Sequence, residues 1–214
     1  MTPVGRSGNA GSRRRRWPLY LLIAIGLAPV IASYFAYYVI QPGGRTNYGT
    51  LLEPQIDLPP LELRTLDGTR FDLERLRGRW IMLMADRAGC AGACQRKLYL
   101  ARQIRLTTGK EQERIERVWI VTDDAPVAPS LLREYEGMHV VRADPARLDF
   151  LPVEAPAQTR LTDHIYMVDP LGHLMMRFPA DPDPGPMKRD VAKLVRATAG
   201  WIMIEPEPAS NGGD

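Results

Sequence analysis

A run of about 24 residues without a charged side chain, 17–40, lies near the N-terminus of this 214-residue chain and limits what it can fold into. At about 1.5 Å per residue, a helix of this length spans roughly 36 Å, more than the bilayer core of about 30 Å. Aromatic residues occur at both ends of the run, as in membrane-spanning helices: Trp17, Tyr20, Tyr34, Tyr37 and Tyr38. We therefore expect a transmembrane anchor over 17–40.

Two alternatives explain this run less well. A cleaved signal peptide has a core of about 7–15 apolar residues followed by a cleavage site of small residues. The run here is longer, and its best candidate site, residues 30–32 (VIA), fits that pattern poorly. The second alternative is a buried helix of a soluble protein. An uncleaved anchor remains the preferred interpretation.

The distribution of charge indicates how such an anchor is oriented. Residues 1–16 contain five arginines and no acid, and removing them from the 28 basic residues leaves 23 against 25 acidic ones, or −2. The net charge of +3 for the whole chain is therefore no sign of nucleic-acid binding, and we expect none. Four consecutive arginines, 13–16, predict a basic cytoplasmic tail over 1–16. In a bacterium, everything after residue 40 would then lie in the periplasm, anchored to the inner membrane.

The order of the expected elements after the anchor defines a fold class. Residues 41–60 have the Gly and Pro content of a linker, and 61–79 read as a β-hairpin around Asp67-Gly68. Further strands are predicted over 80–85, 118–121, 139–141, 165–168 and 174–178, and helices over 95–108, 129–136 and 187–198. This order predicts an α/β sandwich with the thioredoxin fold over 61–204, followed by a flexible tail over 205–214.

The chain has two cysteines, Cys90 and Cys94, separated by three small residues at a predicted strand-to-helix junction. Side chains four positions apart lie on one face of a helix, so the two sulfurs can converge on one ion or on each other. The positive end of the helix stabilises a thiolate, and thiolates are soft ligands that favour Cu(I). A structural pair, a redox pair and a metal site are all open at this point.

Other candidate residues have simpler explanations. We expect His139 and His173 in contact with solvent, and Met175 and Met176 in the core. Asp123 and Asp124 follow the second buried strand, at the end of the sheet where α/β folds often place sites. A carboxylate there can tune a thiol or bind a partner, but a loop cap is the preferred interpretation. The mixed charges of 110–117 (KEQERIER) indicate a solvated helix end.

Several segments resemble the Sco/SenC family of membrane-anchored copper chaperones, which assist assembly of the copper centre in cytochrome c oxidase. The similar segments are the lead-in DGTRFDLERLRGRW, the C-x-x-x-C motif after a strand, the strand VWIVTDD, and a DH pair before IYMVDPLG. They span roughly 61–198, although Ala91 and Gln95 occupy positions where the family usually has proline. The sequence therefore resembles a divergent, thioredoxin-like branch of the Sco/SenC family.

The resemblance implies a function and a set of site residues. Cys90 and Cys94 would be copper thiolates and a redox pair, and His164, preceded by Asp163, would be the imidazole ligand. The partner would be subunit II of cytochrome c oxidase or another respiratory assembly factor. The protein would be a metallochaperone, with thiol–disulfide oxidoreductase activity as in some family members. A thiol–disulfide oxidoreductase without copper and an inert thioredoxin-like scaffold are the alternatives.

Overall fold

A computed structural model describes residues 17–35, 47–154, 158–198 and 200 of the chain. The described residues belong to two units, one within 1–46 and the other beginning at Asn47. The predicted basic tail over 1–16, residues 36–46 and the predicted tail over 205–214 lie outside the described residues.

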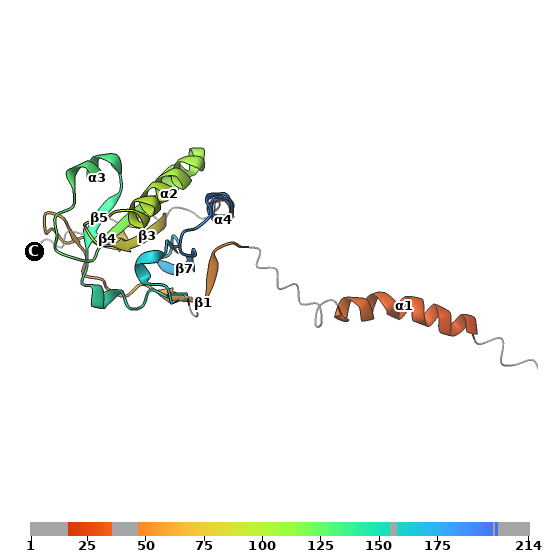
Figure 1. The fold of residues 1–214 in the computed structure, drawn as a ribbon. Coiled ribbons are helices and arrows are strands. Elements are labelled where there is room, and N and C mark those ends of the chain that lie inside the picture. Colours follow the sequence, from red (N-terminus) through yellow and green to blue (C-terminus); the bar gives the residue numbers. More distant parts are fainter. Residues whose placement is uncertain (1–16, 36–46, 155–157, 199, 201–214) are drawn as a thin grey trace, which may run out of the picture. The chain divides into compact units, whose positions relative to one another are not determined.

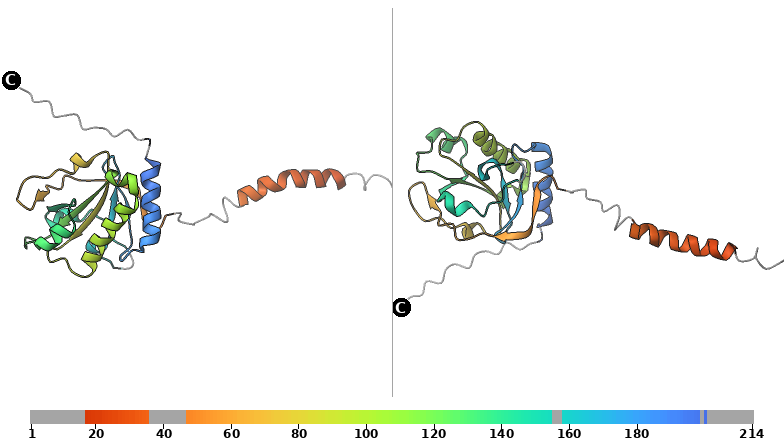
Figure 2. Two further views of the ribbon diagram at one scale, coloured as in Figure 1. Left: turned by 90° about the horizontal axis from the view of Figure 1, so that it is seen from above. Right: turned by 60° about the horizontal axis from the view of Figure 1, so that its bottom comes forward.

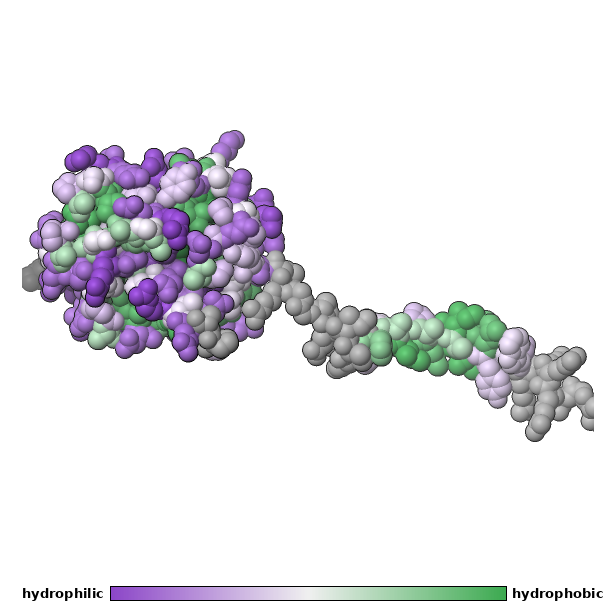
Figure 3. Space-filling model, in the orientation of Figure 1, coloured by the Kyte–Doolittle hydropathy of each residue, from purple (hydrophilic) through white to green (hydrophobic). Residues whose placement is uncertain are grey.

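The first unit contains one helix, α1 (Trp17–Phe35), of 19 residues. By length and composition it is long and apolar enough to cross a membrane. Its surface is largely hydrophobic (Figure 3). The helix agrees with the predicted anchor, of which residues 36–40 lie outside the described residues.

The second unit is built on one mixed sheet with the strand order β1-β7-β6-β3-β4-β5-β2. β3, β4 and β5 run parallel, and the remaining neighbours pair antiparallel. The seven strands are β1 (Thr50–Asp57), β2 (Arg64–Thr65), β3 (Trp80–Asp86), β4 (Ile115–Val121), β5 (His139–Arg142), β6 (Tyr166–Val168) and β7 (His173–Arg177).

Helices and short 3₁₀ turns cover the two faces of this sheet (Figures 1 and 2). The longer helices α2 and α4 lie side by side on one face. The helix α3 covers the same face, because its Leu131 packs into the same core. The helices are α2 (Ala93–Thr107), α3 (Pro129–Glu134) and α4 (Pro184–Ala197), and the 3₁₀ turns are η2 (Leu73–Leu76), η3 (Gly109–Arg114), η4 (Pro145–Leu148) and η5 (Leu161–Asp163). This arrangement is the thioredoxin-like α/β fold that the element order predicts.

The central strand β3 is buried on both faces, as its uninterrupted apolar sequence indicates. Trp80, Met82 and Met84 pack into the core beneath α2 and α4. Ile81, Leu83 and Ala85 pack into the second core, on the opposite face. A strand covered on both sides cannot alternate polar and apolar residues, which explains why residues 80–85 are all hydrophobic.

Two parts of the sheet differ from the sequence-based expectation. The segment 41–60, expected as a linker, contains β1, which pairs with β7 and places Ile56 opposite Leu174. In the expected hairpin over 61–79, only Arg64–Thr65 forms a strand, and it pairs with β5 at the sheet edge. The second arm is reduced to a bridge between Arg64 and Arg70, followed by η2. Edge pairing of this kind depends on distant partners that local sequence does not reveal.

β4 begins three residues earlier than its apolar sequence indicates. Glu116 and Arg117, expected in a solvated helix end, are buried within the strand. The Glu116 carboxylate accepts a hydrogen bond from Arg79 and lies 3.4 Å from His139 Nε2. Burial raises the pKa of Glu116, but the hydrogen bonds and charges of His139 and Arg79 outweigh burial and lower it overall. The expectation of a solvated segment therefore fails, because partners from other elements compensate for burial of this charge.

Asp190 of α4 provides a test of how β1 is attached. It is 3% exposed, and its Oδ2 accepts hydrogen bonds from the backbone N–H groups of Tyr48 (2.6 Å) and Gly49 (2.9 Å). We expect Asp190→Asn to lower the free energy of unfolding by about 1–3 kcal/mol, since the two hydrogen bonds lose the negative charge of their acceptor. Urea unfolding of the detergent-solubilised protein measures this. The exposed Asp124→Asn is the control, and equal stability of the two variants would contradict the assignment.

Candidate redox site

The cysteine pair lies where β3 passes into α2. β3 ends at Asp86, and α2 begins at Ala93 after a turn whose last residue, Gly92, has φ +53°. This left-handed conformation favours glycine over residues with a Cβ. The Cys94 backbone N–H donates to Ala91 O at 3.1 Å, and that of Arg96 donates to Gly92 O at 3.1 Å. The turn thereby carries Cys90 back to the first turn of the helix.

Cys90 and Cys94 form a disulfide with their Cα atoms 5.2 Å apart. The two residues are 6% and 5% exposed, while 91–93 between them are exposed. The sulfur atoms therefore lie just beneath a small surface of alanine and glycine. The Gln95 amide fixes the start of this turn by donating to Cys90 O at 3.2 Å.

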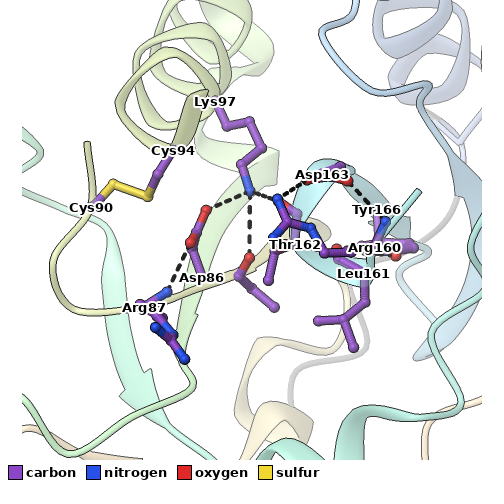
Figure 4. A network of polar contacts seen from close by, with 11 residues as sticks. Asp86, Arg87, Cys90, Cys94, Lys97, Arg160, Leu161, Thr162, Asp163 and Tyr166 are labelled. Carbon is purple, nitrogen blue, oxygen red and sulfur yellow. Dashed lines mark hydrogen bonds and ion pairs between the residues drawn. A yellow bond between two sulfur atoms is a disulfide. The ribbon is translucent and has the colours of Figure 1, made fainter. Parts of the chain in front are cut away.

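A buried ion pair lies at the same junction (Figure 4). Lys97, one helical turn after Cys94, has its ammonium 3.0 Å from Asp86 Oδ2. The same ammonium donates to Thr162 O, in the segment just before His164. Sequence reasoning did not identify Lys97 or Asp86. A signal was present, because Lys97 lies on the stripe that buries Cys94, Leu98 and Ala101.

His164 lies between η5 and β6 and is fully buried, at 0% exposed. Its Nδ1 is 2.8 Å from Phe178 O, which only accepts, so Nδ1 carries the proton. Its Nε2, 2.7 Å from Thr159 Oγ1, is then the acceptor. Burial lowers the pKa of His164, although the bond to Phe178 partly opposes it, and the neutral ring is favoured. Both nitrogens are thus engaged within the protein.

The predicted copper ligands fit a metal only in part. The two sulfurs converge, as a soft ion requires, whereas the Nε2 lone pair of His164 is used by Thr159. Among the residues that the structure describes, no three His, Cys, Asp or Glu side chains gather as a metal site. The ligand set of Cys90, Cys94 and His164 stays a prediction.

The remaining candidates have the expected modest roles. Asp123 Oδ1 accepts from the Ala88 N–H at 3.0 Å, so it caps the loop that leads to Cys90. Met176 is buried in the core. His139 and His173 are partly exposed, and His173 Nδ1 lies 3.1 Å from Asp169 Oδ2.

The sequence also matches a family model, the "transmembrane-like, thioredoxin-like, C-terminal domain", over residues 80–198. The chain belongs to this family. The matched residues run from β3 through the cysteine pair to the end of α4. They include every predicted site residue. No curated protein matches the sequence.

Solved structures share the fold of this family member. Apo Sco1 from Thermus thermophilus matches with a TM-score of 0.52 and 18% identity, covering 72% of this chain and 98% of that one. Copper-bound yeast Sco1 matches with a TM-score of 0.50 and 18% identity, covering 67% and 90%. Copper-bound ScoI from Arabidopsis thaliana matches with a TM-score of 0.50 and 18% identity, covering 65% and 98%. At these identities the likeness concerns the fold alone.

The environment of His164 predicts how stability depends on pH. A lowered pKa in the folded state means that the unfolded chain binds the extra proton first. The stability contributed by neutral His164 is therefore complete above the ordinary pKa of 6.5 and is lost as pH falls through the lowered folded value. We expect His164→Gln to cost about 1–3 kcal/mol at pH 8 through its lost hydrogen bonds, and less at pH 5. Urea unfolding between pH 8 and pH 5 measures this difference, and a cost that does not shrink with falling pH would contradict it.

Proposed function

We propose that the protein is a membrane-anchored thiol–disulfide exchange protein that works through Cys90 and Cys94. One observation carries the proposal: the cysteine pair forms a disulfide at the start of α2 in a thioredoxin-like domain. The residues between the cysteines are small and exposed, so a partner's thiol can approach the sulfurs without displacing a bulky side chain.

The exchange needs no group beyond the two cysteines and a partner dithiol. A partner thiolate attacks one sulfur, the Cys90–Cys94 bond breaks, and its other sulfur leaves as a thiolate that takes up a proton. The second partner thiol then attacks the mixed disulfide. The products are a partner disulfide and a reduced Cys90–Cys94 pair, with two electrons and two protons transferred. The reverse sequence reduces a partner disulfide.

The proposed location is the periplasmic side of a bacterial inner membrane. Supporting it are the length and hydropathy of α1, the arginines over 13–16 and the positive-inside rule. Disulfides persist in that oxidising compartment. There we propose a partner among respiratory assembly factors, subunit II of cytochrome c oxidase included.

Single cysteine variants test the exchange. Cys90 belongs to a loop, whereas Cys94 lies within the first turn of α2, so Cys90 can turn outward without breaking helical hydrogen bonds. We expect Cys94→Ser to accumulate a mixed disulfide with glutathione through Cys90, and Cys90→Ser to accumulate far less. Intact-protein mass spectrometry measures both.

The double variant Cys90→Ser, Cys94→Ser is the control for adducts elsewhere. If dithiothreitol reduces the unfolded chain but leaves the folded protein's disulfide intact, the pair is structural and the proposal is wrong.

Copper transfer is the second candidate function, because the two sulfurs converge and the fold is that of copper-bound yeast Sco1. In this candidate the reduced pair holds Cu(I) as cargo and passes it to the oxidase subunit by ligand exchange.

Anaerobic titration of the reduced protein with Cu(I), against a competing chelator, tests copper binding. We expect about one Cu(I) per chain, and none in the double cysteine variant, because thiolates supply the soft ligands. His164→Ala shows whether His164 is a ligand. Unchanged Cu(I) affinity means that the two cysteines bind the ion without it, and a large loss of Cu(I) affinity means that His164 is a third ligand. No binding by the wild-type protein would remove this candidate.

A further inference from the structure

Lys97 of α2 is a buried lysine close in sequence to the cysteine pair. It is 5% exposed, and lysine is almost never buried to this extent unless its charge is paired. Its position, three residues after Cys94, is on the same face of the helix as that cysteine. The domain therefore keeps a cation within the packed layer beneath its redox pair.

Three acceptors surround the Lys97 ammonium. They are Asp86 Oδ2 at 3.0 Å, Ala85 O at 3.4 Å and Thr162 O. An ammonium has three N–H donors, so each has one acceptor. Two acceptors come from the end of β3, and the third comes from η5, so the side chain joins the strand, the helix and the segment before β6 (Figure 4).

Asp86 depends on this contact for its charge balance. Its carboxylate is largely buried, with 22% of the side chain exposed. Among the described residues, Lys97 is the one basic side chain that forms an ion pair with it. Its other bond is to the Arg87 backbone N–H at 2.9 Å. Without Lys97, an uncompensated carboxylate would lie four residues before Cys90.

Exchange at the disulfide places negative charge at the same junction. The sulfur released from the Cys90–Cys94 bond leaves as a thiolate, and a nearby unpaired carboxylate opposes that charge whereas a cation favours it. We propose that Lys97 is a positioning residue for the exchange: its ammonium neutralises Asp86 and holds η5 against the junction. This inference rests on the proposed thiol–disulfide function.

Two substitutions, one removing the positive charge of the ion pair and the other its negative charge, test the inference in the full-length protein. Lys97→Met leaves Asp86 unpaired, and Asp86→Asn leaves Lys97 unpaired. We expect Lys97→Met to slow reduction by glutathione and shift the equilibrium toward the disulfide, each about tenfold, because the unpaired Asp86 carboxylate opposes the negative charge of the released thiolate. Asp86→Asn is expected to shift both in the opposite direction, and Lys97→Arg to restore most of the wild-type behaviour. Arg102→Met, further along α2, is the control for loss of a positive charge.

The outcomes distinguish this inference from the proposed function. A wild-type disulfide that does not equilibrate with glutathione overturns the function. A wild-type protein that reacts while Lys97→Met reacts equally overturns only the role of Lys97. If Lys97→Met does not fold, Asp86→Asn decides: a shift toward the dithiol supports the inference, and no shift or a shift toward the disulfide overturns it. A purely structural role would not produce opposite signs.

Discussion

The burial of β3 on both faces is the constraint on which the rest of the domain depends. Because β3 pairs with β4 on one side and β6 on the other, its backbone groups are satisfied within the sheet and its side chains fill both cores. The chain leaves the sheet at the C-terminal end of this strand. In this domain that end is Asp86, and the turn that follows carries Cys90 and Cys94. The site thus lies at the carboxyl end of the central parallel strands, where α/β folds commonly place their chemistry.

The junction combines a tight turn with a buried charge. Gly92 supplies the left-handed residue that returns the chain to α2, and the small residues between the cysteines form the surface that covers the disulfide. Beneath this surface, Lys97 and Asp86 replace what would otherwise be apolar packing. A buried ion pair adds little stability compared with hydrophobic side chains of similar volume. This low contribution to stability is consistent with the positioning role proposed for Lys97.

The hydrogen bonds of His164 show why a shared fold does not establish a shared metal site. The chain shares its fold with copper-bound yeast Sco1 at 18% identity, a level at which the likeness in backbone path does not establish what individual side chains do. Here the ring of His164 joins Thr159 to Phe178 O. It therefore connects the loop before β6 to the end of β7, and Cu(I) could use it only if the bond from Thr159 were given up. The cysteines require no such rearrangement after reduction.

Local sequence was enough to predict the apolar helix over 17–35, the buried strands β3, β4 and β6, and the position of the cysteines at a strand-to-helix junction. These features depend on runs of apolar residues and on spacing within one segment. Strand β1 in the expected linker, the buried Glu116 and the Lys97 contacts depend on partners that are distant in the chain: β7, Arg79 and Thr162. The same holds for the hydrogen bonds of His164, the residue that the resemblance to the Sco/SenC family implied as a ligand. Sequence by itself determined where the sulfurs lie, and tertiary structure alone decided which charges and hydrogen bonds surround them, because burial and pairing are set by the packing of separate elements.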